Sequence, residues 1–150
     1  MNPTYAYDEI INLLSNKNYD KFKLTNTYAI VYTDTEDATE ILFEINNGSI
    51  SDELAELAID VFKNLDNCIK KAYNWLDHFY LKNDKWYSKA LDGGFEIYGI
   101  YFGKYGYGHQ PKPLTDGFTI SFNTKNEYPC IFTVKFRKNM QPFAVEEWVS

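Results

Sequence analysis

The chain has 150 residues and a formal net charge of −6, with 45% hydrophobic and 24% charged residues. This size and composition are typical of a globular protein, and we expect residues 1–150 to form a single domain. The amino terminus lacks the basic start of a secretory signal, and no apolar run is long enough to span a membrane, so we expect a cytoplasmic protein with no membrane partner. The acidic balance argues against nucleic acid as a partner.

The first third of the chain predicts one helix and two strands. Residues 5–15 carry a weak helical pattern, and the polar segment 16–24 predicts a connection or a short strand. Residues 27–33 are β-branched and aromatic, and in residues 39–45 apolar and acidic side chains partly alternate. The five polar residues between these two runs favour a hairpin.

The clearest pattern in the chain begins after residues 46–51, which we interpret as a break followed by a helix cap. Ser51 is a good N-cap, and Asp52 and Glu53 follow it at the positive end of the expected helix. Apolar residues then recur every three or four positions as far as Phe79. This pattern predicts one amphipathic helix of about seven turns that packs against a sheet.

The second half of the chain predicts four strands. Residues 95–103 are apolar on both faces, which is typical of a central strand. Three further strands are expected at residues 117–123, 130–137 and 142–149. Apolar and polar side chains alternate in the first two, and the third begins with a proline, which suits the start of a strand. Short turns join the three strands into an antiparallel meander. The whole pattern predicts an α+β fold with a largely antiparallel sheet of about five to six strands and one long amphipathic helix across a face.

The segment YFGKYGYGHQPKP, residues 101–113, combines glycines, tyrosines and His109. Its glycine spacing is G-x-x-G-x-G, and prolines and a strand follow it, so it does not match a phosphate-binding loop that opens a helix. The chain holds only two histidines and two cysteines, and none of them has the spacing of a metal site. We therefore expect no cofactor and no metal.

No set of residues in the sequence defines a catalytic site. Cys68 lies on the apolar stripe of the expected helix and Cys130 in the apolar pattern of a strand, so free core thiols are favoured over a disulfide. Neighbouring Glu146 and Glu147 would point to opposite faces of a strand. No G-x-S-x-G motif is present. We assign no catalytic residue, and an enzymatic function has no positive support.

Charge is unevenly distributed along the chain. Residues 1–60 contain twelve acidic side chains against three lysines, a net charge of −9. An acidic surface suits a basic protein partner, although it could also serve solubility alone. We therefore expect a non-catalytic protein-binding module. The candidate contact residues are acids of the hairpin and helix and aromatic residues of the 101–113 segment: Glu36, Asp37, Glu40, Glu44, Asp52, Glu53, Glu56, Asp60, Tyr105, Tyr107 and His109.

Four segments of the chain resemble a general class of known proteins, without matching a diagnostic motif. These segments are the capped helix SDELAELAIDVF and the strands FEIYGIYFG, DGFTISF and FTVKF. They resemble small, acidic, single-domain bacterial α+β proteins of unknown function, some of which are toxin-immunity proteins. The resemblance implies a binding protein that occludes another protein. It implies no particular functional residue.

Two other functions stay open at this point. One is a small-ligand binder or enzyme with a pocket near residues 101–113. The other is a structural protein that forms homodimers through exposed aromatic side chains. The residues that would line the pocket are Tyr101, Tyr105, Tyr107, His109 and Asp116.

Overall fold

The computed structural model describes residues 2–36, 38–79, 95–103, 117–124 and 130–149. In chain order the elements are β1 Thr4–Tyr5, α1 Tyr7–Ser15, the 3-10 helix η1 Tyr19–Lys21, β2 Lys23–Leu24, β3 Tyr28–Thr33, β4 Glu40–Asn46, β5 Ser49–Ile50, α2 Asp52–Lys63, α3 Leu65–Phe79, β6 Phe95–Phe102, β7 Phe118–Thr124, β8 Cys130–Phe136 and β9 Pro142–Val149. The fold is α+β, as predicted.

Nine strands form one open mixed sheet in the order β1-β3-β4-β6-β7-β8-β9, with β2 beside β3 and β5 beside β4. The β3–β4 hairpin and the β7–β8–β9 meander are antiparallel, which confirms both predictions. Strand β6 is central, parallel to β4 and antiparallel to β7. The sheet is larger than the five or six strands predicted. The extra strands β1, β2 and β5 have two residues each, too few to leave a detectable periodicity.

The long helix predicted after Ser51 is in fact two helices, α2 and α3, separated by Asn64. The Asn64 backbone N–H donates to the carbonyl oxygens of Asp60 and Val61, and its side-chain amide also donates to the Asp60 carbonyl at 2.8 Å. The Asn64 carbonyl in turn accepts from the Cys68 N–H at 3.0 Å. This asparagine therefore ends one helix and starts the next. None of the helices in the described ranges has both the length and the hydropathy needed to cross a bilayer.

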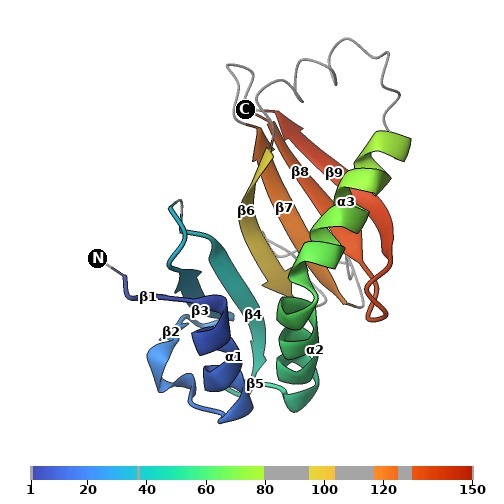
Figure 1. Ribbon diagram of the computed structural model, residues 1–150. Helices are drawn as coiled ribbons and strands as arrows, with labels where there is room; N and C mark the ends of the chain where they lie inside the picture. Colours follow the sequence, from blue (N-terminus) through green and yellow to red (C-terminus); the bar gives the residue numbers. More distant parts are fainter. Residues whose placement is uncertain (1, 37, 80–94, 104–116, 125–129, 150) are drawn as a thin grey trace.

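All three helices lie on one side of the sheet, with α3 running diagonally over the carboxy-terminal strands (Figure 1). The sheet face beneath them is packed with aromatic side chains. Phe43, Phe102, Phe118 and Phe136 come from four adjacent strands, and all four are fully buried. Their rings stack in series with centroid separations of 5.2, 5.7 and 4.6 Å. This row of stacked rings lies in the hydrophobic core.

A tight turn in the segment interpreted as a break makes a second hairpin. Strands β4 and β5 pair Asn46 with Ser49, and the two residues between them are Asn47 at φ 55° and Gly48 at φ 76°. Two consecutive positive φ values define a type I′ turn, for which Asn-Gly is the preferred sequence. The N-cap prediction for the helix that follows is confirmed, since the Ser51 side chain accepts from the Leu54 N–H at 3.2 Å.

Candidate functional site

The structure places the acidic candidate residues on different sides of the molecule. In β4, Ile41 and Phe43 are fully buried on the helix-covered face, so the alternating Glu40 and Glu44 point to the opposite face of the sheet. The carboxylates of α2 lie on the exposed side of that helix, within the helical layer. The hairpin and helix candidates therefore do not form one continuous surface.

Two of the helix candidates take part in ion pairs across the surface. Asp52 lies 3.3 Å from the Lys17 ammonium group, and Glu53 pairs with Lys138. Such solvent-exposed pairs are worth at most about 1 kcal/mol. Both residues also occupy the first turn of α2, the positive end of the helix at which the sequence predicted them.

The remaining candidates are either exposed, buried or beyond the described residues. Glu36, Glu56 and Asp60 are exposed. Tyr101 is only 1% exposed and lies with its ring edge-on to Tyr28 at 5.9 Å, so it lines neither cavity described below. The other candidates lie outside the residues that the structure describes: Asp37, Tyr105, Tyr107, His109 and Asp116.

On the sheet face away from the helices, β3, β4 and β6 present an acidic tyrosine patch. We define this patch by six residues: Tyr28, Tyr32, Glu40, Glu44, Glu96 and Tyr98. The sequences of these three strands contain three glutamates and no lysine or arginine. The patch is therefore a region of negative charge interleaved with aromatic rings.

The register of the β3–β4 hairpin places a tyrosine opposite a glutamate at two positions. Tyr28 lies opposite Glu44, and Tyr32 lies opposite Glu40. The pKa of each tyrosine is raised, first by burial and then by the neighbouring glutamate charge. Both phenols therefore remain protonated at neutral pH and can donate hydrogen bonds. The Tyr32 hydroxyl donates to Glu40 Oε2 over a long 3.5 Å.

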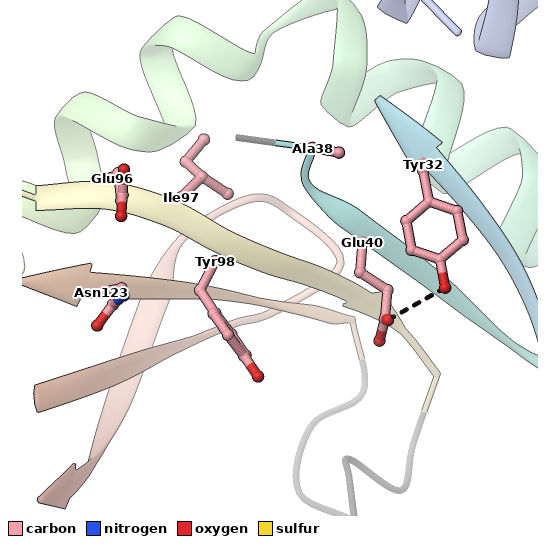
Figure 2. Close-up of a pocket in the computed structure, with 7 residues that line it drawn as sticks. All are labelled: Tyr32, Ala38, Glu40, Glu96, Ile97, Tyr98 and Asn123. Carbon is pink, nitrogen blue, oxygen red and sulfur yellow. Dashed lines mark hydrogen bonds between the residues drawn. The ribbon is translucent and has the colours of Figure 1, made fainter. Parts of the chain in front are cut away.

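One end of the patch is hollowed into a recess of about 270 Å³, shown in Figure 2. Two features of β6 explain the hollow. The residue opposite Glu40 is Gly99, which presents no side chain to fill the space. The β6–β7 register also shifts between Ile97 and Gly99, a bulge at Tyr98. The recess is lined by Tyr32, Ala38, Glu40, Glu96, Ile97, Tyr98 and Asn123.

Hydrogen bonds hold the walls of the recess in place. The Thr33 hydroxyl accepts from the Thr39 N–H at 2.8 Å, and the Thr39 carbonyl accepts from the Thr33 N–H at 3.0 Å. The Thr39 hydroxyl also reaches the Ile97 carbonyl at 3.5 Å, which joins β4 to β6 beside the hollow. Both threonines are buried. The strands that carry Glu40 and Tyr98 are therefore fixed relative to each other.

The chemistry of the recess is that of a cation acceptor. Its lining offers two carboxylates, two phenol rings and the Asn123 amide, and none of the described residues that line it is a lysine or an arginine. Carboxylates and ring faces both attract positive charge. In the described part of the chain, no three His, Cys, Asp or Glu side chains are grouped in a way that could hold a metal ion.

A second cavity, of about 390 Å³, lies where α2 meets α3. The helix break at Asn64 creates it. Its charged lining residues, Lys63 and Asp66, are opposite in sign, so their formal charges cancel. Its lining is Tyr7, Phe62, Lys63, Asn64, Leu65, Asp66 and Asn67.

Of the recess residues, only Glu40 was a candidate from the sequence. Glu96 and Tyr98 lie in a different strand, more than fifty positions further along the chain, and join Glu40 only through the parallel β4–β6 pairing. One local signal was present: an isolated glycine inside a strand pattern, Gly99, indicates a bulge or a close approach. Without the strand order, that signal could not reveal which side chains surround it.

No family model, curated protein or solved structure matches this chain.

Proposed function

We propose that this protein is a non-catalytic binding module that engages a basic protein partner through the acidic tyrosine patch. The observation that supports the proposal is the composition of β3, β4 and β6, whose face away from the helices combines glutamates and tyrosines and whose sequences contain no basic residue. A surface of one charge sign attracts a partner of the opposite sign and orients it during encounter.

The tyrosines supply the second ingredient of a contact surface. Tyr98 is 51% exposed although it is a large aromatic residue, and Tyr32, which lines the same recess, is half-buried. Tyrosine is enriched at the energetic centres of protein interfaces because it buries a large rigid area and keeps a polar end. The glutamates would steer the partner, and the tyrosines would anchor it.

We further propose that the partner is an enzyme whose activity the complex inhibits, as in the toxin-immunity proteins that the sequence resembles. A module of this kind needs only a complementary surface, which agrees with the absence of any catalytic motif from the sequence. The first check is the genomic neighbourhood. A toxin gene with a basic product beside this gene would support the immunity role, and co-expression would then be expected to relieve toxicity.

The binding proposal is tested by quantitative capture with two charge-matched variants. Glu40→Gln/Glu44→Gln removes two charges from the patch, and Glu56→Gln/Asp60→Asn removes two from the exposed side of α2. Each protein is immobilised and incubated with lysate at about 50 mM and about 500 mM salt, because exposed charges are screened over a few ångströms at high salt. Captured proteins are quantified by mass spectrometry.

We expect the wild type and the α2 variant to retain the same basic protein at low salt. The patch variant should lose most of it, and high salt should release it from all three. Failure of the wild type to retain any specific basic protein would contradict the proposal. Equal retention by the two variants would show that the patch is not the contact surface. A self-association of the wild type in size-exclusion chromatography that the patch variant abolishes would favour a homodimer instead.

A further inference from the structure

We infer that the recess at the end of the acidic tyrosine patch binds the guanidinium group of an arginine side chain. The inference rests on the proposed function, since it assigns that arginine to the basic partner. It goes further by naming the chemical group that is recognised and the residues that recognise it: Tyr32, Glu40, Glu96, Tyr98 and Asn123.

The size of the recess points to a single side chain. Its volume is about 270 Å³. Sites for drug-sized small molecules and cofactors usually have volumes of about 300–1,000 Å³ and enclose most of the ligand. A hollow below this range suits the end of one long side chain that projects from a partner surface. The position of the recess, at one end of the patch, allows the rest of the partner to contact Tyr28 and Glu44.

The arrangement of the lining suits a planar cation. Figure 2 shows the side chains of Glu40 and Tyr98 extending in the same direction from β4 and β6, with Tyr32 on the other side of the carboxylate. A guanidinium group can donate two parallel hydrogen bonds to one carboxylate while its face stacks on an aromatic ring. Glu40 would accept those bonds, and Tyr98 would supply the ring.

The Tyr32 hydroxyl contacts the Glu40 carboxylate over a long 3.5 Å before any ligand arrives. Within the described residues the contact is to Oε2, which leaves Oε1 for the ligand to approach. The pKa of Tyr32 is raised by burial and by Glu40, so the phenol keeps the proton that it donates. The bulge in β6 lies at Tyr98, next to the recess. Bulges often occur beside functional sites, where they redirect a side chain. The site is therefore organised in advance, which lowers the entropy lost on binding.

Arginine fits this site better than lysine. A lysine ammonium is a compact, strongly hydrated charge that gains little from a flat ring and cannot bind a carboxylate through two parallel bonds. Anions are disfavoured because two carboxylates line the hollow. The inference is therefore specific for guanidinium.

The test uses N-acetyl-L-arginine amide as the probe, titrated into the ¹⁵N-labelled full chain and followed by backbone NMR shifts. The corresponding citrulline compound is a neutral probe of nearly the same shape, and N-acetyl-L-lysine amide is a cation without the planar fork. The variants are Glu40→Gln, which keeps the shape of the carboxylate, and Tyr98→Ala, at an exposed position. Asp20→Asn is the control, since Asp20 is an exposed acid in η1 that lines neither cavity.

We expect the arginine probe to bind with a Kd of roughly 1–10 mM, the strength of a single side-chain contact, with the largest shifts at Glu96–Tyr98 and Asn123. Glu40→Gln should weaken binding at least about fivefold and Tyr98→Ala about threefold, because each removes one favourable contact. The control should stay within about twofold of the wild type. The citrulline and lysine probes should bind at least about fivefold more weakly than arginine.

The inference is overturned if the arginine probe causes no shifts in the recess at roughly 50 mM. It is also overturned if lysine or citrulline binds as tightly as arginine, or if the Asp20 control weakens binding as much as Glu40→Gln. These outcomes are separate from the fate of the proposed function. A partner that is captured through the patch while the probe fails would remove the arginine site alone. Probe binding with no captured partner would remove the proposed function and leave a guanidinium site.

Discussion

Burial controls the protonation of the phenol of Tyr7, the first residue of α1, which packs against α2. Its ring lies 5.5 Å from Phe62, and burial raises the pKa of the phenol while a hydrogen bond with Thr39 acts in the opposite direction. Tyr73 in α3 has a pKa raised by burial in the same way. Both residues are neutral at physiological pH, so their effect on stability is confined to alkaline solution.

We predict that the folded state loses stability as the pH rises above about 10. The unfolded tyrosine has a pKa near 10.0, and the folded pKa of Tyr7 is higher. Between the two values the unfolded chain releases a proton that the folded chain keeps. The contribution to stability is therefore complete below the unfolded pKa and is lost as the pH rises through the folded pKa.

Urea denaturation midpoints of the wild type and Tyr7→Phe between pH 8 and pH 11 provide the measurement. The phenylalanine variant should show the smaller decline above about pH 10, because it has no proton to lose at this position. Parallel curves for the two proteins would show that Tyr7 titrates alike in both states.

Cys68 illustrates a residue whose environment the sequence predicted correctly. It is fully buried as a free thiol on the apolar side of α3, and its pKa is raised by burial, with a smaller opposing effect of Lys71. A raised thiol pKa means little thiolate at neutral pH. This agrees with its interpretation as an inert core residue.

At the scale of the elements, the β4–β5 turn offers the cleanest test of backbone conformation. Gly48 has a φ of 76°, and a Cβ added there would meet no atom within 4 Å. Gly48→Ala should therefore lower the free energy of unfolding by about 1–2 kcal/mol, the cost of a left-handed conformation for a residue with a Cβ. Crowding would add nothing to this cost.

Gly48→Asn serves as the matched variant, because asparagine tolerates the left-handed region better than alanine. It should recover much of the loss in urea denaturation. If the alanine variant is as stable as the wild type, the turn does not keep its type I′ geometry in solution.

The helix break shows how one residue interrupts a pattern that continues on either side of it. Buried residues of α2 and α3 stay on the sheet-facing side across Asn64, so the three- and four-residue spacing gives no sign of an interruption. Asparagine competes for backbone hydrogen bonds through its side chain, which is how it caps α2 here. Packing decides whether the asparagine side chain wins this competition and ends the helix. The spacing of the apolar residues carries no information about that outcome.

At the scale of the whole molecule, stability depends on the row of stacked phenylalanines. Phe102 is central to it, since its ring lies 5.2 Å from Phe43, 5.7 Å from Phe118 and 5.5 Å from Phe62 of α2. This residue therefore connects the two halves of the sheet to the helical layer. Its side chain is fully buried.

Phe102→Ala should lower the free energy of unfolding by about 3–5 kcal/mol, because it removes a buried ring and leaves a cavity. That is a large part of the total stability of a typical domain, about 5–15 kcal/mol. Leu24→Ala is the control, since Leu24 is 55% exposed and its truncation should change stability by no more than about 0.5 kcal/mol. Urea denaturation followed by circular dichroism measures both. A loss below about 1 kcal/mol for Phe102→Ala would contradict this role of the phenylalanine row.

The sequence alone determined the α+β class, the six longer strands and the amphipathic stripe from Leu54 to Phe79. These features are local, because side chains alternate along a strand and recur every three or four residues along a helix. It also determined the Ser51 cap, whose hydroxyl accepts a hydrogen bond from a backbone N–H only three residues away.

Only the tertiary structure decided the order of the strands, the parallel pairing of β4 with β6 and the recess that this pairing creates. Glu40 and Glu96 are distant in the chain, and nothing in the local pattern of either strand shows that the two strands are neighbours. Which strands pair, and in which register, depends on how all the apolar faces are buried together. The acidic residues of the hairpin and of α2 look like one group in the sequence, because the sequence does not show on which side of the sheet each element lies. In the structure the helices pack on one face of the sheet, and the glutamates of β4 point to the other face.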